Sequence, residues 1–197
     1  ENSDIICLAS FYERIFDMNK KSIMRVFRDT SYVRMGGTDA ELKCAQYLKD
    51  YCAGLGCEAV IEPFEVPMGK IACESLTVDG EAVPCKGYML CGSGSVSAPL
   101  YYLTGSDKYS LSLCRDKIVL IDGYLGRWMY HDVVSNGAAG IITYDGHVNY
   151  SDRDIDAREL RQAAVGEDKK LLCVNINVKD AVRLIKNGVK NAEIRIE

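Results

Sequence analysis

Histidine is scarce in this 197-residue chain, which contains only His131 and His147. An enzyme that uses histidine as a general base or as a metal ligand needs further functional groups close to it. His131 is followed by Asp132, and His147 by Val148 and Asn149, but neither stretch continues into a known catalytic or metal-binding motif. We therefore interpret both histidines as structural or merely exposed, and we predict no catalytic residue and no metal ligand in this chain.

The chain also lacks a long apolar run and an excess of basic residues. No segment approaches the roughly 20 consecutive apolar residues that a membrane-spanning helix needs, so we expect no membrane span. Lysine and arginine total 24 against 28 aspartates and glutamates, which gives a net charge of −4. This balance provides no basic field to recruit nucleic acid, and no nucleic-acid partner is predicted. The 48% of apolar residues is ample for a hydrophobic core.

Nine cysteines are present, but no Cys-x-x-Cys motif, which disfavours a zinc ribbon and a thioredoxin-like site. Their number is odd and their spacing irregular, so we interpret most as free thiols in a reducing compartment. Pairing of Cys52 with Cys57, or of Cys85 with Cys91, stays open if the protein is secreted. The localisation is thus undecided: the cysteines favour the cytoplasm, but the chain begins at Glu1 without methionine, which leaves a removed leader open.

The first 68 residues have the pattern of helices followed by one strand. Residues 3–29 carry apolar side chains at helical spacing. The stretch from Thr38 to Glu41 is a capping box, in which the Thr38 hydroxyl accepts from the Glu41 amide and the Glu41 carboxylate reaches back to the Thr38 amide. A helix is therefore expected to begin there. Residues 57–66 then alternate as a strand, and Pro63 favours an edge position.

From residue 69 onward, short apolar runs alternate with turns, which predicts a β-rich domain with short helices over residues 69–188. Residues 189–197 are interpreted as a strand that returns toward the first region. The charged stretch 151–170 is expected to be a solvated loop or a surface helix. The expected strands and helices are a hairpin over 75–83 that turns at Asp79-Gly80, strands over 98–103, 117–121, 140–144, 171–176 and 189–196, and helices over 130–136 and 179–187.

One cluster is a candidate ligand-binding site. Arg127, Trp128 and Tyr130 follow Gly126, and arginine and aromatic residues dominate binding hot spots. The alternative is that Trp128 simply covers the core of its domain, and we prefer this second interpretation.

Two stretches resemble a known module. The sequence KIVLIDG over residues 117–123, a short helix, and NGAAGIITYDG over residues 136–146 are similar to the protease-associated domain. In that domain a strand "GKIVLV" and a segment "AGAAGVIIYN" flank such a helix. The later stretch NINVKDAVRLIKNG, residues 175–188, resembles the closing strand and helix of the same domain.

The region before residue 69 resembles the zinc-dependent aminopeptidases related to glutamate carboxypeptidase. The similar parts are RMGGT over residues 34–38, the helix over residues 40–56, and the strand CEAVIEPFEVP over residues 57–67. Those enzymes carry a protease-associated domain inserted after such a strand. The resemblance implies a mixed α/β fold, in which the N-terminal helices and a strand of a peptidase region precede a protease-associated domain.

The resemblance further implies a zinc exopeptidase as the parent protein, with peptide substrates. In that family two histidines and several carboxylates hold a pair of zinc ions, and a glutamate acts as general base. The matching ligands are not in this chain, and we expect them beyond Glu197. The chain alone is thus predicted to be inactive, to hold no cofactor, and to have the missing catalytic region or a peptide as its partner.

Two other interpretations stay open. The chain could be a stand-alone, non-enzymatic module that binds proteins or peptides. It could also be an enzyme that uses its cysteines for thiol or metal chemistry, although no signature of such a family is present.

Overall fold

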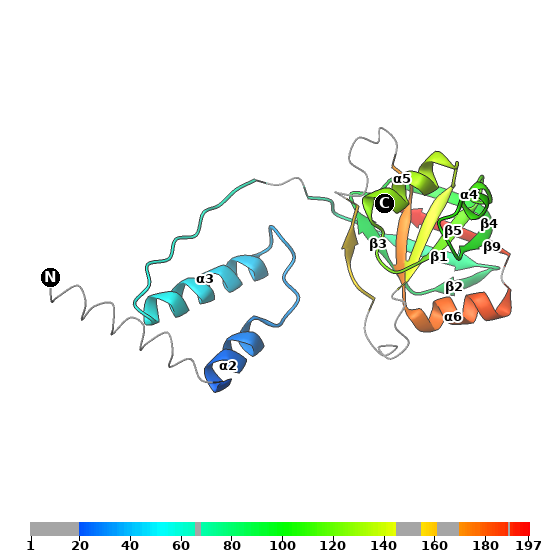
Figure 1. Ribbon diagram of the computed structural model, residues 1–197. Coiled ribbons are helices and arrows are strands. Elements are labelled where there is room, and N and C mark those ends of the chain that lie inside the picture. Colours follow the sequence, from blue (N-terminus) through cyan, green and yellow to red (C-terminus); the bar gives the residue numbers. More distant parts are fainter. Residues whose placement is uncertain (1–19, 66–67, 145–154, 161–169, 189) are drawn as a thin grey trace, which may run out of the picture. The chain divides into compact units, whose positions relative to one another are not determined.

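The computed structural model of the protein describes residues 20–65, 68–144, 155–160, 170–188 and 190–197. The chain divides into two compact units (Figure 1). Unit 1 is residues 1–68 and unit 2 is residues 69–197.

Unit 1 contains two described helices, α2 (Lys20–Thr30) and α3 (Asp39–Gly54). The cap of α3 differs in one detail from the predicted box. The Glu41 amide donates to Oγ1 of Thr38 at 3.4 Å, as expected. The Glu41 carboxylate, however, accepts from the Gly37 amide at 2.6 Å rather than from Thr38. The Thr38 amide donates instead to the carbonyl of Met35, because the preceding turn already provides that acceptor.

Unit 1 buries little of its apolar surface. In the described part of its helices only Cys44 is buried. The strand predicted over residues 57–66 is not formed, since residues 57–65 belong to no helix or strand. A strand needs a hydrogen-bonded neighbour, and the described part of unit 1 offers none. The large apolar residues that are exposed here are Ile23, Met24, Phe27, Val33, Met35, Leu42, Leu48, Val60, Phe64 and Met68.

Unit 2 is built on a mixed sheet with strand order β2-β1-β9-β4-β5-β6-β8-β3-β7. Strands β4, β5, β6 and β8 run parallel to one another. The neighbouring strands in the order β2-β1-β9-β4 pair antiparallel, and so do β3 and β8. Strand β3 also contacts β1, so the sheet curls back toward itself. The elements described are β1 (Glu74–Val78), β2 (Glu81–Val83), β3 (Cys85–Met89), β4 (Gly94–Leu103), α4 (Lys108–Ser112), β5 (Ile118–Asp122), α5 (Arg127–Ser135), β6 (Gly140–Tyr144), β7 (Arg158–Glu159), β8 (Cys173–Ile176), α6 (Val178–Asn187) and β9 (Asn191–Ile196).

The alternation of side chains along the strands creates two hydrophobic clusters, one on each face of the sheet. In β5, Ile118 and Leu120 join the cluster that α6 covers, whereas Val119 and Ile121 join the cluster on the other face. Helices α4 and α5 cover that second face (Figure 1). The first four residues of β5, Ile118 to Ile121, are all buried, as their unbroken apolar run predicts.

Several predicted elements are confirmed at their turns. Asp79 and Gly80 connect β1 to β2, and both have positive φ angles, 47° and 88°. Gly188 ends α6 in the left-handed conformation, which glycine adopts without a steric penalty. The last strand differs from expectation in its surroundings: residues 191–196 lie inside the sheet of unit 2, between β1 and β4.

Candidate functional site

The parallel strands of unit 2 define an edge at which ligands bind in many α/β proteins. Strands β4, β5 and β6 are neighbours and parallel, so their carboxyl ends meet at one edge of the sheet. Adjacent strands are about 4.8 Å apart, which brings the segments that follow them close together. Helix α4 begins after β4, and helix α5 begins after β5, so both helices start at this edge. In open α/β sheets, ligands bind outside the carboxyl ends of the strands.

Three exposed aromatic side chains belong to the segments that follow β4 and β5. Tyr109 in α4 is 74% exposed, Tyr124 in the loop after β5 is 68% exposed, and Trp128 in α5 is 79% exposed. They are the exposed large hydrophobic residues in the described part of unit 2. The cationic residues Lys108 and Arg127 are exposed beside them in sequence. We call these five residues the aromatic surface.

The structure separates the three residues predicted from sequence. Arg127 and Trp128 belong to the aromatic surface, but Tyr130 is fully buried, and its hydroxyl accepts a hydrogen bond from the Leu171 amide at 3.0 Å. The preferred interpretation, that Trp128 covers the core, is wrong. Helix α5 buries Tyr130 and Val133, and two residues of helix turn by about 200°, so Trp128 faces the opposite side from Tyr130.

Sequence reasoning missed Lys108, Tyr109 and Tyr124. The missed helix α4 had a usable signal, because Asp107 precedes it and caps it. The Asp107 carboxylate accepts hydrogen bonds from the amides of Tyr109 at 3.0 Å and Ser110 at 3.1 Å. The hydrogen bond from the Ser110 hydroxyl, together with these two amide bonds, lowers the pKa of Asp107.

A buried polar network lies behind Tyr124. Arg158 is only 8% exposed, and its Nη1 donates to the carbonyl of Gly123 at 2.9 Å, to Oγ1 of Thr143 at 3.1 Å and to the hydroxyl of Tyr88 at 3.2 Å. Its guanidinium also lies 5.7 Å from the centre of the Tyr124 ring, within the range of a cation–π contact. Sequence analysis had interpreted residues 151–170 as solvated, which is wrong at Arg158.

Thr143 is the centre of this network. Its hydroxyl donates to Oδ1 of Asn175 at 2.9 Å and lies 2.7 Å from the Tyr88 hydroxyl. Nδ2 of Asn175 donates in turn to the carbonyl of Asp156 at 3.2 Å. Burial raises the pKa of Tyr88, and the hydrogen bonds that Tyr88 forms with Arg158 and Thr143 act in the opposite direction. The Tyr88 phenol therefore stays protonated near neutral pH, and the network anchors the segment around Arg158 rather than supplying a base.

The described cysteines are free thiols, so neither of the two pairings left open by the sequence is formed. Burial raises the pKa of Cys173 well above its usual range. Burial, with a smaller effect of the nearby Glu74 carboxylate, raises the pKa of Cys85 to about 11. A thiol must ionise to act as a nucleophile, so these two sites disfavour thiol catalysis.

The described residues do not fit a zinc ion. No group of three or more histidine, cysteine, aspartate or glutamate residues is close enough to hold a metal among them. Nδ1 of His131 lies 3.9 Å from Oδ1 of Asp132 in an exposed pair, which is too small a ligand set. His147 lies outside the described residues.

Unit 1 has a cavity of its own, about 470 Å³ in volume, between the start of α3 and residues 61–64. Leu42, Ala45, Ile61 and Phe64 give it an apolar lining. Because Leu42 and Phe64 are also exposed, the cavity opens onto the apolar surface of this unit.

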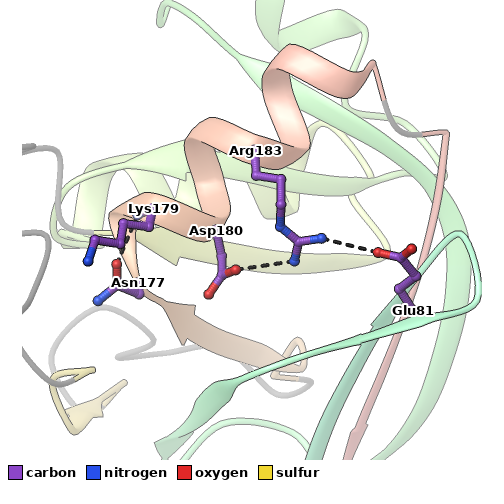
Figure 2. A network of polar contacts seen from close by, with 5 residues as sticks. All are labelled: Glu81, Asn177, Lys179, Asp180 and Arg183. Carbon is purple, nitrogen blue, oxygen red and sulfur yellow. Dashed lines mark hydrogen bonds and ion pairs between the residues drawn. The ribbon is translucent and has the colours of Figure 1, made fainter.

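A second polar network connects α6 to the β1–β2 hairpin (Figure 2). Nη1 of Arg183 is 3.1 Å from Oε2 of Glu81, and its Nη2 is 3.2 Å from Oδ1 of Asp180. Asn177 caps the helix by accepting from the Lys179 amide at 2.8 Å. A small groove of about 220 Å³ lies beside Arg183. The ion pairs neutralise the guanidinium, so the network is a surface connection and no ligand site follows from it.

Comparison with known proteins gives matches among solved structures. No protein-family model matches the chain, and no curated protein matches it. The zinc aminopeptidase BSAP from Bacillus subtilis superposes with a TM-score of 0.63 over 87% of this chain, at 19% sequence identity. An aminopeptidase from Aneurinibacillus sp. strain AM-1 superposes with a TM-score of 0.56 over 95% of this chain, at 16% identity.

The fold is that of part of these aminopeptidases. The alignments cover only 42% and 43% of the two matched chains, so this chain spans less than half of their length. The mixed α/β class and the resemblance to zinc-dependent aminopeptidases are confirmed at the level of the fold. Within the described residues, no helix combines the length and the apolar character that crossing a membrane requires.

Proposed function

We propose that this chain is a non-catalytic portion of a zinc-dependent exopeptidase of the aminopeptidase type. The observation that carries the proposal is the structural similarity to the zinc aminopeptidase of Bacillus subtilis over 87% of the chain. In this proposal zinc and its ligands belong to the rest of the parent protein, which also cleaves N-terminal residues from peptides.

Unit 1 is proposed to belong to the peptidase region of that parent. Its two described helices expose apolar side chains that a folded domain normally covers, including Phe27 and Leu42. Residues 57–65 belong to no helix or strand and have no paired neighbour in the described part of the unit. Both features are expected of a piece whose remaining sheet and core come from further residues.

Unit 2 is proposed to be a protease-associated domain that shapes access of peptides to the active site, or that mediates association with another protein. It has a hydrophobic cluster on each face of its sheet. Its exposed aromatic side chains provide a surface suited to recognition rather than to bond cleavage.

The test is a peptidase assay on the full-length gene product beside the 197-residue chain. We expect the full-length protein to release the N-terminal residue of an unblocked peptide, to leave the N-acetylated peptide intact, and to lose activity with a zinc chelator. The 197-residue chain should release nothing. Full-length protein that binds no zinc and cleaves neither peptide would contradict the proposal.

The alternative is a stand-alone module that binds peptides, and the aromatic surface is the observation that favours it. The two functions differ in what the gene encodes after Glu197. A His-x-Asp motif followed by Glu-Glu and a later histidine supports the peptidase, because these residues would supply the zinc ligands and the base. A stop codon in that position supports the module.

A further inference from the structure

Two cysteine thiols of unit 2 lie beside one backbone hydrogen bond, at the end of β3 and the start of β8. The Gly92 amide donates to the carbonyl of Leu171 at 3.0 Å. The sulfur of Cys91 lies 3.2 Å from the carbonyl oxygen of Gly92. The sulfur of Cys173 lies 3.5 Å from the carbonyl oxygen of Leu171. The two thiols therefore contact the two residues that this one hydrogen bond joins.

The pairing of the strands brings the same two segments together. Strands β3 and β8 pair antiparallel, with Gly87 opposite Val174. The next residue of β3, Tyr88, therefore stands opposite Cys173. After β3 the chain turns back, because the Cys91 amide donates to the carbonyl of Tyr88 at 3.3 Å. Cys91 thus returns to the residue that stands opposite Cys173.

The two thiols also share their surroundings. Cys173 is fully buried in the hydrophobic cluster that α4 and α5 cover, and Cys91, which is partly exposed, packs against the same cluster. Burial raises the pKa of both thiols. The charge of a Cys91 thiolate raises the pKa of Cys173 further, an effect that weakens with distance. One accessible thiol therefore lies near one buried thiol.

The turn that carries Cys91 is tightly constrained. Leu90 has a φ angle of 63°, which is uncommon for a bulky residue and is strained backbone. A Cβ at Gly92 would lie 2.2 Å from the carbonyl oxygen of Lys170, so the two backbones are in direct contact there. A disulfide requires Cα atoms about 4–7 Å apart, a separation that two backbones in contact allow.

We propose that Cys91 and Cys173 are a redox pair, which a small disulfide such as oxidised glutathione converts into an intramolecular disulfide in the folded protein. The Cys91 thiolate attacks the small disulfide, forms a mixed disulfide and releases one thiol. The Cys173 sulfur then attacks the Cys91 sulfur, and the second thiol leaves. Two protein thiols lose two electrons, the small disulfide gains them, and the two protons end on the released thiols. The proposal concerns unit 2 alone, so it does not depend on the proposed peptidase function.

The experiment equilibrates the 197-residue chain with reduced and oxidised glutathione, blocks the remaining thiols with N-ethylmaleimide, and maps tryptic peptides without reduction. Cleavage after lysine places Cys91 in peptide 87–108 and Cys173 in peptide 171–179, and neither peptide contains another cysteine. We expect these two peptides to be joined, with the loss of two hydrogen atoms in mass. The matched control Cys85→Ser changes another partly buried cysteine of β3, and in this variant the two peptides should still be joined.

Thermal unfolding shows whether the disulfide fits the folded protein. Oxidation should raise the Tm of unit 2 by about 10 °C, because the bond closes a loop of about 80 residues. Trp128, the only tryptophan of the chain, reports this transition by fluorescence. Cys91→Ser, treated with the same glutathione mixture, should show no such increase.

Three results would overturn the proposal. The first is a folded chain in which the two peptides stay unjoined and become joined only in urea. The second is an unchanged Tm of the oxidised wild type, because a bond that distorts the fold does not stabilise it. The third is an increase in Tm that is equally large in Cys91→Ser, since it would come from other thiols.

Discussion

The substitution Thr143→Val removes the centre of the buried network while it preserves the shape of the side chain. Thr143 is fully buried, and its hydroxyl bonds to Tyr88, Arg158 and Asn175 at 2.7, 3.1 and 2.9 Å. Valine occupies nearly the same volume and suits a strand, so packing and β propensity change little. The decrease in the free energy of unfolding therefore reports on the hydrogen bonds alone.

The magnitude follows from the number of partners left behind. Each net hydrogen bond contributes about 1 kcal/mol, and a buried partner without its bond costs about 1–3 kcal/mol. Arg158 retains its bond to the carbonyl of Gly123, which limits the penalty on the charged group. Three lost bonds then predict a fall of about 3 kcal/mol in the free energy of unfolding. For a unit of this size the fall corresponds to a decrease of about 10 °C in Tm.

The assay is urea unfolding of the 197-residue chain, followed by tryptophan fluorescence, which reports on unit 2 through Trp128. The matched control is Thr77→Val, a half-buried threonine of β1 whose replacement should change stability by less than about 0.5 kcal/mol. A loss in Thr143→Val no larger than that in Thr77→Val would refute the interpretation of the network. It would mean that the buried groups contribute no net stability.

Three further predictions concern features away from this network. The Asp79 carboxylate accepts from two backbone amides, which lowers its pKa below the usual 3.8; its stabilising effect is thus fully present above pH 3.8 and is lost as the pH falls through the lowered value. The free energies of unfolding of wild type and Asp79→Asn should accordingly differ at pH 6 and converge in strong acid. A difference that stays constant with pH would contradict this assignment. Gly92→Ala places a Cβ 2.2 Å from the carbonyl oxygen of Lys170 and should lower the free energy of unfolding by about 2–3 kcal/mol. The control Gly54→Ala should be tolerated, because its Cβ would have no atom within 4 Å. Equal Tm values for the two variants would refute the clash. Arg183→Gln removes both ion pairs shown in Figure 2 but should cost less than about 1 kcal/mol, with the loss shrinking in high salt, because the side chain is exposed; a loss of several kcal/mol would show that this network is more than a surface connection.

Much of unit 2 could be predicted because its signals are local. Asp79-Gly80 can adopt the positive φ angles of a tight hairpin, and Gly188 can end a helix in the left-handed conformation. The unbroken apolar run from Ile118 to Ile121 requires burial on both faces of a sheet.

The rest depends on tertiary contacts that a single stretch of sequence does not contain. Residues 57–65 alternate like a strand, but pairing requires a neighbour. The burial of Arg158 depends on Thr143 and Tyr88, which are 15 and 70 residues away in the chain. The candidate site was half predicted for a similar reason. Arg127 and Trp128, at the start of α5, were identified from the sequence. Tyr109 belongs to another helix, α4, which only the parallel order of the strands brings to the same edge.

The most direct test of the central claim, that unit 1 is part of a larger peptidase domain, is amide hydrogen exchange over residues 57–65. The measurement compares the 197-residue chain with the full-length gene product. If further residues pair with this segment and cover the apolar helices, its amides should exchange quickly in the short chain and at least about 100-fold more slowly in the full-length protein. Equally fast exchange in both proteins would contradict the claim.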